Sequence, residues 1–102
     1  MPPRVADILY DAFFGREVTN RYYRNLTDVS TATATNDLAR VEASGLVQAA
    51  GAGRSRTYIG SAALIDAVSR LGRLGEPPQG VPDADRRAWV VARLAERIRD
   101  TP

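Results

Sequence analysis

The side chains that could do chemistry in this chain are arginines, carboxylates and hydroxyls, because it contains no histidine and no cysteine. All 14 basic residues are arginine, whose planar guanidinium group binds phosphate and guanine in a bidentate manner. An all-arginine set is also typical of codon bias in a GC-rich genome. Without histidine or cysteine the commonest general base and metal ligands are missing. We therefore expect no enzyme activity, no metal site and no cofactor.

Two pairs of carboxylates have a spacing that could serve acid–base chemistry. Asp7 and Asp11 are four residues apart, so they share one helix face, which we predict to be solvated. Asp83 and Asp85 precede an amphipathic run and are typical of a helix start. Both pairs therefore have a structural explanation, and an enzyme is the least supported function class.

Length and composition predict one small folded protein. The 102 residues suit a single domain with a modest core, and 44% are apolar. The net charge of +2 is only weakly basic and does not by itself indicate a nucleic-acid partner. No apolar run is long enough to cross a membrane and no signal peptide is visible, so we expect no membrane contact and a cytoplasmic location.

Residues 30–44 form the helix around which the chain is organised. Ser30 is a good N-cap, and Ala34, Leu38 and Val41 recur at helical spacing as a buried stripe. Gly45 suits the left-handed position after the helix. The opposite face is polar and almost uncharged, with short side chains that allow close approach to another surface. The residues predicted to contact DNA from this recognition helix are Ser30, Thr31, Thr33, Thr35, Asn36 and Arg40.

The elements around this helix predict a helix-turn-helix followed by a hairpin. Helices are expected at residues 4–14 and 19–26, with Glu17-Val18 as a bridge of strand and a turn at 27–29. Tyr23, Leu26 and Val29 should be buried. Strands at 46–49 and 57–59 enclose a glycine-rich tip. This order, mainly helical with a small hairpin, is that of a winged helix, and we assign residues 1–60 to it.

Several polar residues could hold DNA phosphates beside the recognition helix. Arginines that enter the minor groove or pair with phosphate are typical of a wing. The alternative is a plain surface hairpin with solvated arginines. The predicted backbone-contacting residues are Arg21, Arg24, Arg54, Ser55 and Arg56.

Residues 61–102 form a helical extension that we expect to pack on the same domain and to pair two subunits. Helices are predicted at 61–73, with Leu64, Ile65, Val68 and Leu71 on one apolar face, and at 83–99, separated by a Pro/Gly-rich loop at 76–82. Trp89 falls on the polar side of the last helix, which indicates a partner contact, packing under that loop, or stacking on Arg93. The predicted interface residues are Trp89, Val91, Leu94 and Ile98.

Two motifs resemble the winged helix domain at the C-terminal end of many bacterial Fic-type proteins. That family has a pattern close to S-x-A-T-A-x-R-D-L followed by G-x-G-R-S-x-x-Y, and the similarity covers residues 18–60. The family's arginine before Asp37 is Asn36 here, and a common basic position is Thr31, so the helix has lost positive charge. The Fic catalytic histidine is absent, which excludes nucleotidyl transfer for this chain. The matching residues are Ser30, Ala32, Thr33, Ala34, Asp37, Leu38, Gly51, Gly53, Arg54, Ser55 and Tyr58.

The sequence therefore predicts a module that binds double-stranded DNA sequence-specifically, as a dimeric bacterial transcription regulator. The alternative is a winged helix used for protein–protein contact or self-association, including as a regulatory fragment of a larger Fic-type protein. The small residues Ala32, Ala39 and Ala43 and the low net charge favour that alternative. A continuous arginine surface joining helix and wing would favour DNA.

Overall fold

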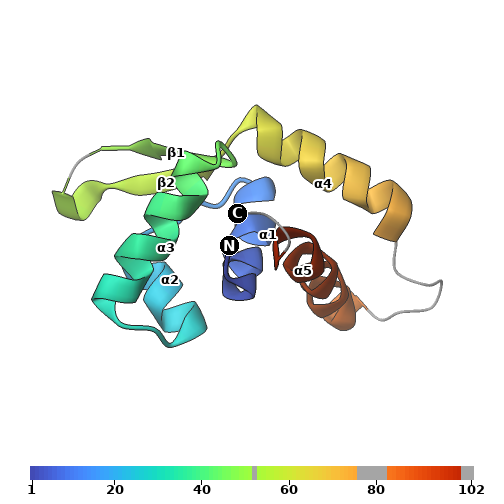
Figure 1. Cartoon of the computed structure of the whole chain (residues 1–102), viewed down its shortest axis with the longest axis horizontal. Coiled ribbons are helices and arrows are strands. Elements are labelled where there is room, and N and C mark those ends of the chain that lie inside the picture. Colours follow the sequence, from blue (N-terminus) through green and yellow to red (C-terminus); the bar gives the residue numbers. More distant parts are fainter. Residues whose placement is uncertain (52, 76–82, 100–102) are drawn as a thin grey trace.

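The computed structural model describes residues 1–51, 53–75 and 83–99, which fold into helices and one two-stranded antiparallel sheet (Figure 1). The five predicted helices and the two predicted strands agree with the structure to within about two residues at each end. The predicted loop at 76–82 lies outside the described residues. In chain order the elements are η1 (Pro3–Val5), α1 (Ala6–Phe13), α2 (Asn20–Thr27), α3 (Thr31–Ala43), β1 (Val47–Ala50), η2 (Gly53–Ser55), β2 (Thr57–Gly60), α4 (Ala62–Gly75) and α5 (Asp83–Arg99).

Capping residues define the α2–turn–α3 unit. Thr19 and Ser30 accept the backbone N–H groups of Tyr22 and Thr33, so each closes the first turn of its helix. Asp28 ends α2 in the left-handed region at φ 55°, which redirects the chain into α3. Gly45 follows α3 at φ 84°, as the sequence predicts.

The sheet is a short hairpin with one additional bridge. Val47 pairs with Gly60 and Ala50 with Thr57, and the glycine-rich segment with η2 forms the connection at its tip. Val18 exchanges two backbone hydrogen bonds with Tyr58, of 2.9 and 2.7 Å, which confirms the predicted bridge of strand before α2. The hairpin is therefore anchored to the segment that leads into the helix pair.

Helix α1 lies at the centre of the molecule, and the other elements surround it (Figure 1). α5 packs against α1 and η1, and α4 packs against α1 and α5. Among the described residues, no helix combines the length and the apolarity needed to cross a membrane. The buried core includes Val5, Ile8, Leu9, Val18, Tyr23, Leu38, Val41, Leu64, Leu94 and Ile98.

The structure corrects three burial predictions. Leu26 was expected inside, but it is 38% exposed. Leu94 and Ile98 were expected at a subunit interface, but each is only 5% exposed because α5 turns this face toward α1. Helical spacing predicts which residues share a face, but not how much of that face a neighbouring element covers.

Gly60 fixes the end of β2 against α1. A Cβ at this position would lie 2.8 Å from the Ala12 carbonyl oxygen, closer than real Cβ contacts, so the two backbones approach to a distance that only glycine allows. The hairpin is thus held against α1 at Gly60 and against Val18 at Tyr58.

Candidate functional site

An open cleft of about 880 Å³ lies between α2, α3 and the hairpin. Figure 1 shows α3 with α2 on one side and the hairpin beside its other end. Three arginines line the cleft, two from α2 and one, Arg56, from the residue just before β2. The residues that line it include Asn20, Arg21, Arg24, Thr35, Ala39 and Arg56.

Side-chain hydrogen bonds connect α2 to α3 along the floor of the cleft. Arg24 Nε donates to Asn20 Oδ1 at 2.7 Å, and Asn20 Nδ2 donates to Thr35 Oγ1 at 3.2 Å. Thr35 Oγ1 in turn donates to the Thr31 carbonyl oxygen at 2.9 Å. Arg21 is exposed at the same edge of α2. Arg24 is therefore positioned by its neighbours, whereas Arg21 extends into solvent.

Arg56 closes the hairpin side of the cleft by pairing with α3. Its Nη2 donates to both carboxylate oxygens of Glu42, at 3.0 and 3.2 Å, and its guanidinium lies 5.6 Å from the Tyr58 ring centre. The hydrogen bond to Glu42 raises the pKa of Arg56, so this group stays charged. The sequence predicted Arg56 as a wing cation open to DNA, but it points back to α3. The Arg54 side chain lies outside the described residues, and Ser55 is exposed.

The predicted contact residues of α3 divide into two groups. Thr31, Asn36 and Arg40 are exposed on the outer face, together with Thr35 at the cleft edge. Ser30 and Thr33 form the helix cap instead, since Ser30 Oγ accepts the Thr33 N–H at 3.1 Å and donates to Thr33 Oγ1 at 3.0 Å. The outer face thus presents one amide, two threonine hydroxyls and one guanidinium.

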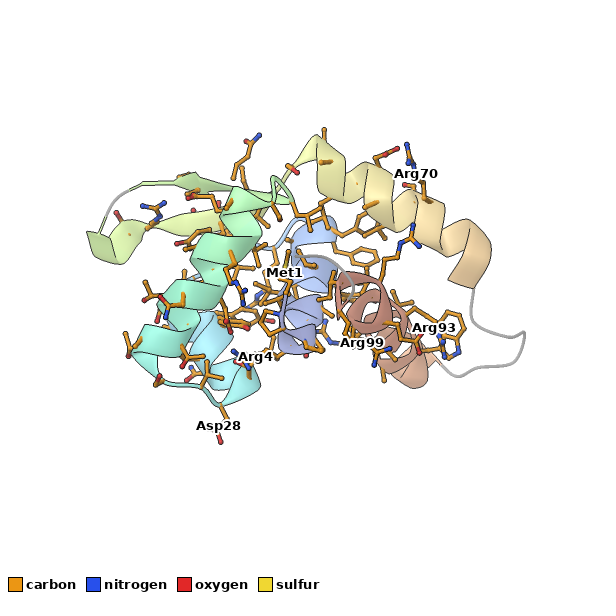
Figure 2. All side chains as sticks on the ribbon, in the orientation of Figure 1. Met1, Arg4, Asp28, Arg70, Arg93 and Arg99 are labelled. Atoms are coloured by element: carbon orange, nitrogen blue, oxygen red, sulfur yellow. The ribbon has the colours of Figure 1, made fainter. Side chains whose placement is uncertain are left out.

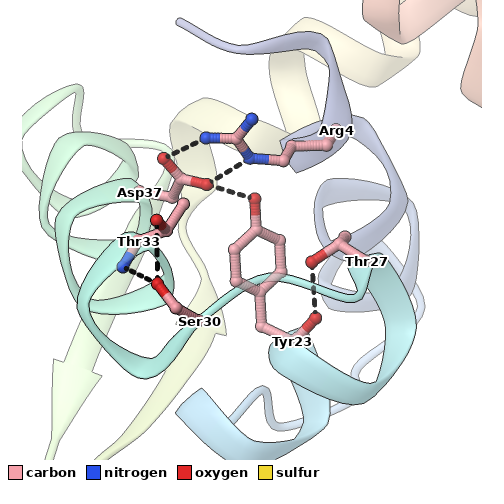
Figure 3. A network of polar contacts seen from close by, with 6 residues as sticks. All are labelled: Arg4, Tyr23, Thr27, Ser30, Thr33 and Asp37. Carbon is pink, nitrogen blue, oxygen red and sulfur yellow. Dashed lines mark hydrogen bonds and ion pairs between the residues drawn. The ribbon is translucent and has the colours of Figure 1, made fainter.

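The buried face of α3 is held by a carboxylate, Asp37 (Figure 3). Arg4 donates to it through Nε at 2.6 Å and through Nη2 at 3.1 Å, and the buried Tyr23 hydroxyl donates to it at 2.8 Å. Burial opposes ionisation of Asp37, but the bonds from Arg4 and Tyr23 outweigh it and lower its pKa. Burial, followed by the bond to Asp37, raises the pKa of Tyr23. This network fixes α3 against η1 and α2.

A second buried carboxylate, Asp11, corrects the prediction that Asp7 and Asp11 form a solvated face. Asp11 is 8% exposed and accepts hydrogen bonds from Tyr22 Oη and Arg87, while Asp7 lies 3.6 Å from Arg87. Burial raises the pKa of Asp11, but the bonds from Arg87 and Tyr22 more than offset it, so the net shift is downward. The partners lie on α2 and α5, which sequence spacing within one helix does not reveal.

The outer face of α5 carries the rest of the predicted interface. Trp89 is half-buried with the Arg93 guanidinium 5.1 Å from its ring centre, which agrees with the expected stacking on Arg93. Arg93 lies on the side of the molecule away from α3 and the hairpin (Figure 2). A shallow groove of about 390 Å³ is lined by Asp7 of α1 and, on α5, by Arg87, Ala88, Val91, Ala92 and Ala95. Of the four predicted residues, Trp89 and Val91 therefore keep accessible surface.

Three residues that shape the site, Glu42, Asp37 and Asn20, were not among the predicted site residues. Thr35, Ala39 and Glu42 have helical spacing that places them on one edge of α3, so Glu42 could have been found from that pattern. Asp37 lies three residues after Ala34 and four before Val41, inside the apolar stripe, which indicates a buried carboxylate. Asn20 carries no comparable signal. No group of three or more acidic, histidine or cysteine side chains within the described ranges is arranged to hold a metal ion.

Comparison of the chain with known protein families, with curated proteins and with solved structures finds no match. The resemblance to the winged helix domain of Fic-type proteins therefore rests on its two motifs alone.

Proposed function

We propose that this chain is a winged helix-turn-helix domain that binds double-stranded DNA sequence-specifically and regulates transcription. The observation that carries the proposal is the cleft in which Arg21, Arg24 and Arg56 lie beside the exposed edge of α3. These guanidinium groups come from α2 and from the hairpin, on either side of the helix that would enter the major groove. An arginine surface of this kind favours DNA over a protein partner.

In this proposal α3 supplies the base contacts. Its first turn has no acidic residue, so the positive end of the helix dipole is not neutralised there. Asn36 is exposed on the outer face, where its amide can donate to and accept from an adenine edge. The threonine methyl groups of Thr31 and Thr35 can contact thymine. Arg21, Arg24 and Arg40 would supply phosphate contacts, which position the protein without selecting bases.

A homodimer is the second part of the proposal. α5 lies on the opposite side of α1 from α3, so a two-fold contact there would leave both recognition helices free for a palindromic site (Figure 1). Trp89, Val91 and the neighbouring groove of α5 support such a contact. Sedimentation of the wild type and of Val91→Arg would test it. A monomer at all concentrations, unchanged in Val91→Arg, contradicts the dimer but not DNA binding.

The test of DNA binding is a selection from random duplexes, followed by gel shifts of the selected and scrambled sites at two salt concentrations. Asn36→Ala should weaken the selected site by about 1–3 kcal/mol and leave scrambled DNA nearly unchanged. Arg21→Ala should weaken both sites similarly and reduce the salt dependence by about one contact. Arg70→Ala is the matched control, since Arg70 pairs with Asp66 on α4, far from the cleft (Figure 2).

Absence of any bound duplex at low salt would contradict the proposal. The alternative function is then a protein-contact module that uses the same helix, including as a regulatory fragment of a larger protein. Ala32, Ala39 and Ala43 are exposed on α3, and their small side chains suit close packing with protein. Self-association that is lost in Ala39→Arg would support this alternative.

A further inference from the structure

An acidic side chain of α3, Glu42, pairs with Arg56, one of the arginines that line the cleft. Glu42 is on the same edge of α3 as Thr35 and Ala39, and it binds Arg56 across the hairpin side of the cleft. A phosphate that enters the cleft therefore meets the exposed Arg21, the half-buried Arg24 and a third cation, Arg56, that already has an anionic partner. Glu42 has no place in the contact set proposed above.

We propose that Glu42 competes with the DNA backbone for Arg56 and thereby limits the affinity of the site. The inference rests on the proposed DNA binding and adds an internal competitor to it. In the free protein Arg56 is held by Glu42, and in the complex a phosphate oxygen replaces the carboxylate. Binding at this position then requires a phosphate placed within reach of Arg56, and a backbone that lies elsewhere gains nothing from this residue.

The geometry makes the Glu42–Arg56 pair displaceable. Both carboxylate oxygens bind the same nitrogen, Nη2, rather than two nitrogens of the guanidinium fork, so the pair lacks the strong end-on arrangement. The Arg56 and Glu42 side chains are 44% and 36% exposed, so water screens their attraction. Displacing Glu42 from Arg56 therefore costs little free energy. A neutral residue at position 42 would remove even this small cost.

Repulsion between Glu42 and phosphate is a different mechanism that would also weaken binding. The two mechanisms differ in their dependence on Arg56. Competition requires the Arg56 guanidinium, so its effect disappears when Arg56 is removed. Repulsion acts on the phosphate directly and persists without Arg56. A double-mutant cycle between positions 42 and 56 separates them.

The experiment measures the dissociation constant for the selected duplex as a function of salt for Glu42→Gln, Arg56→Ala and the double variant. Glu96→Gln is the matched control, because Glu96 forms an exposed pair with Arg93 on α5 and its loss changes the net charge equally. Glu42→Gln should bind about three- to fivefold more tightly than wild type, the range that loss of an exposed pair allows. Its salt dependence should stay close to that of wild type, because Arg56 contacts phosphate in both complexes, whereas Arg56→Ala should lose about one phosphate contact. Glu96→Gln should bind like wild type.

Three results would overturn the inference in distinguishable ways. Equal affinities of Glu42→Gln and Glu96→Gln would mean that Glu42 does not restrain binding, although DNA binding itself stands. A gain from Glu42→Gln that persists in the Arg56→Ala background would mean repulsion rather than competition. Failure of every variant to bind duplex at low salt would remove the proposed function and this inference together.

Discussion

The two faces of α3 use acidic side chains in opposite ways. On the inner face Asp37 is 5% exposed and accepts three hydrogen bonds from Arg4 and Tyr23, which come from η1 and α2. On the outer face Glu42 is partly exposed and binds a single nitrogen of Arg56. Both are carboxylate–arginine pairs with a partly exposed arginine, but the Asp37 carboxylate is buried and also accepts from Tyr23, whereas the Glu42 carboxylate is partly exposed.

This difference indicates which charges hold the fold and which can change partner. A buried carboxylate that loses a donor keeps its desolvation cost, so the inner network cannot rearrange cheaply. An exposed pair exchanges its partner for water or for another anion with little change in free energy. We therefore expect substitutions at the inner face to change stability, and substitutions at the outer face to change binding.

The largest expected effect is that of Asp37→Asn. The amide retains the size of the side chain but removes the charge that receives three hydrogen bonds, so the protein should lose about 2–3 kcal/mol of unfolding free energy. Urea unfolding followed by circular dichroism measures this. Asp66→Asn on the exposed face of α4 is the control. Equal stability of Asp37→Asn and wild type would mean that the inner network does not hold α3.

Acid should act more strongly on the inner face than on the outer face. The pKa values of Asp37 and Asp11 are lowered in the fold, so their stabilisation is fully present above the unfolded value of about 3.9 and is lost as pH falls through the folded values. Unfolding free energies at pH 7 and pH 3 should therefore differ more in wild type than in Asp37→Asn. An identical acid loss in both proteins would contradict the assignment of this effect to Asp37.

Tyr23→Phe should have a smaller effect of the same sign. It removes one hydrogen bond to a buried carboxylate but leaves Arg4 in place, so we expect a loss of about 1–2 kcal/mol in thermal or urea unfolding. Tyr22→Phe, which removes the corresponding bond to the other buried carboxylate, Asp11, is the matched variant. Because Tyr22 is only half-buried, its loss should cost less. The reverse order would show that the Asp11 network is the stronger one.

The smallest expected effect on stability is that of Glu42→Gln. Loss of this exposed pair should change the unfolding free energy by no more than its about three- to fivefold effect on binding corresponds to, because both measure the same interaction in the free protein, and glutamine suits the helix as well as glutamate does. Differential scanning fluorimetry beside the binding measurements would test this. A large destabilisation would mean that Glu42 belongs with Asp37 as a structural residue.

The helices and the hairpin could be predicted from local signals, whereas the contacts of the site could not. Ser30, Gly45 and the stripe of Ala34, Leu38 and Val41 determine α3 within its own segment. The partners of Asp11 and Asp37 come from positions 87 and 4, far away in sequence, and no spacing rule relates them. The direction of Arg56 likewise depends on where α3 lies relative to the hairpin. Local chemistry thus predicted the elements, and tertiary packing decided which charges remain available.

The Asp11–Arg87 pair also has a consequence for how the chain is made. These residues are 76 positions apart. After it has added Asp11, the ribosome therefore needs about 4–15 s to reach Arg87. During that interval α1 has neither Arg87 nor the core side chains Leu94 and Ile98 to cover it. The central helix of the molecule is therefore among the first elements synthesised and among the last to be enclosed. A nascent chain halted after α4 should remain open to proteases at α1.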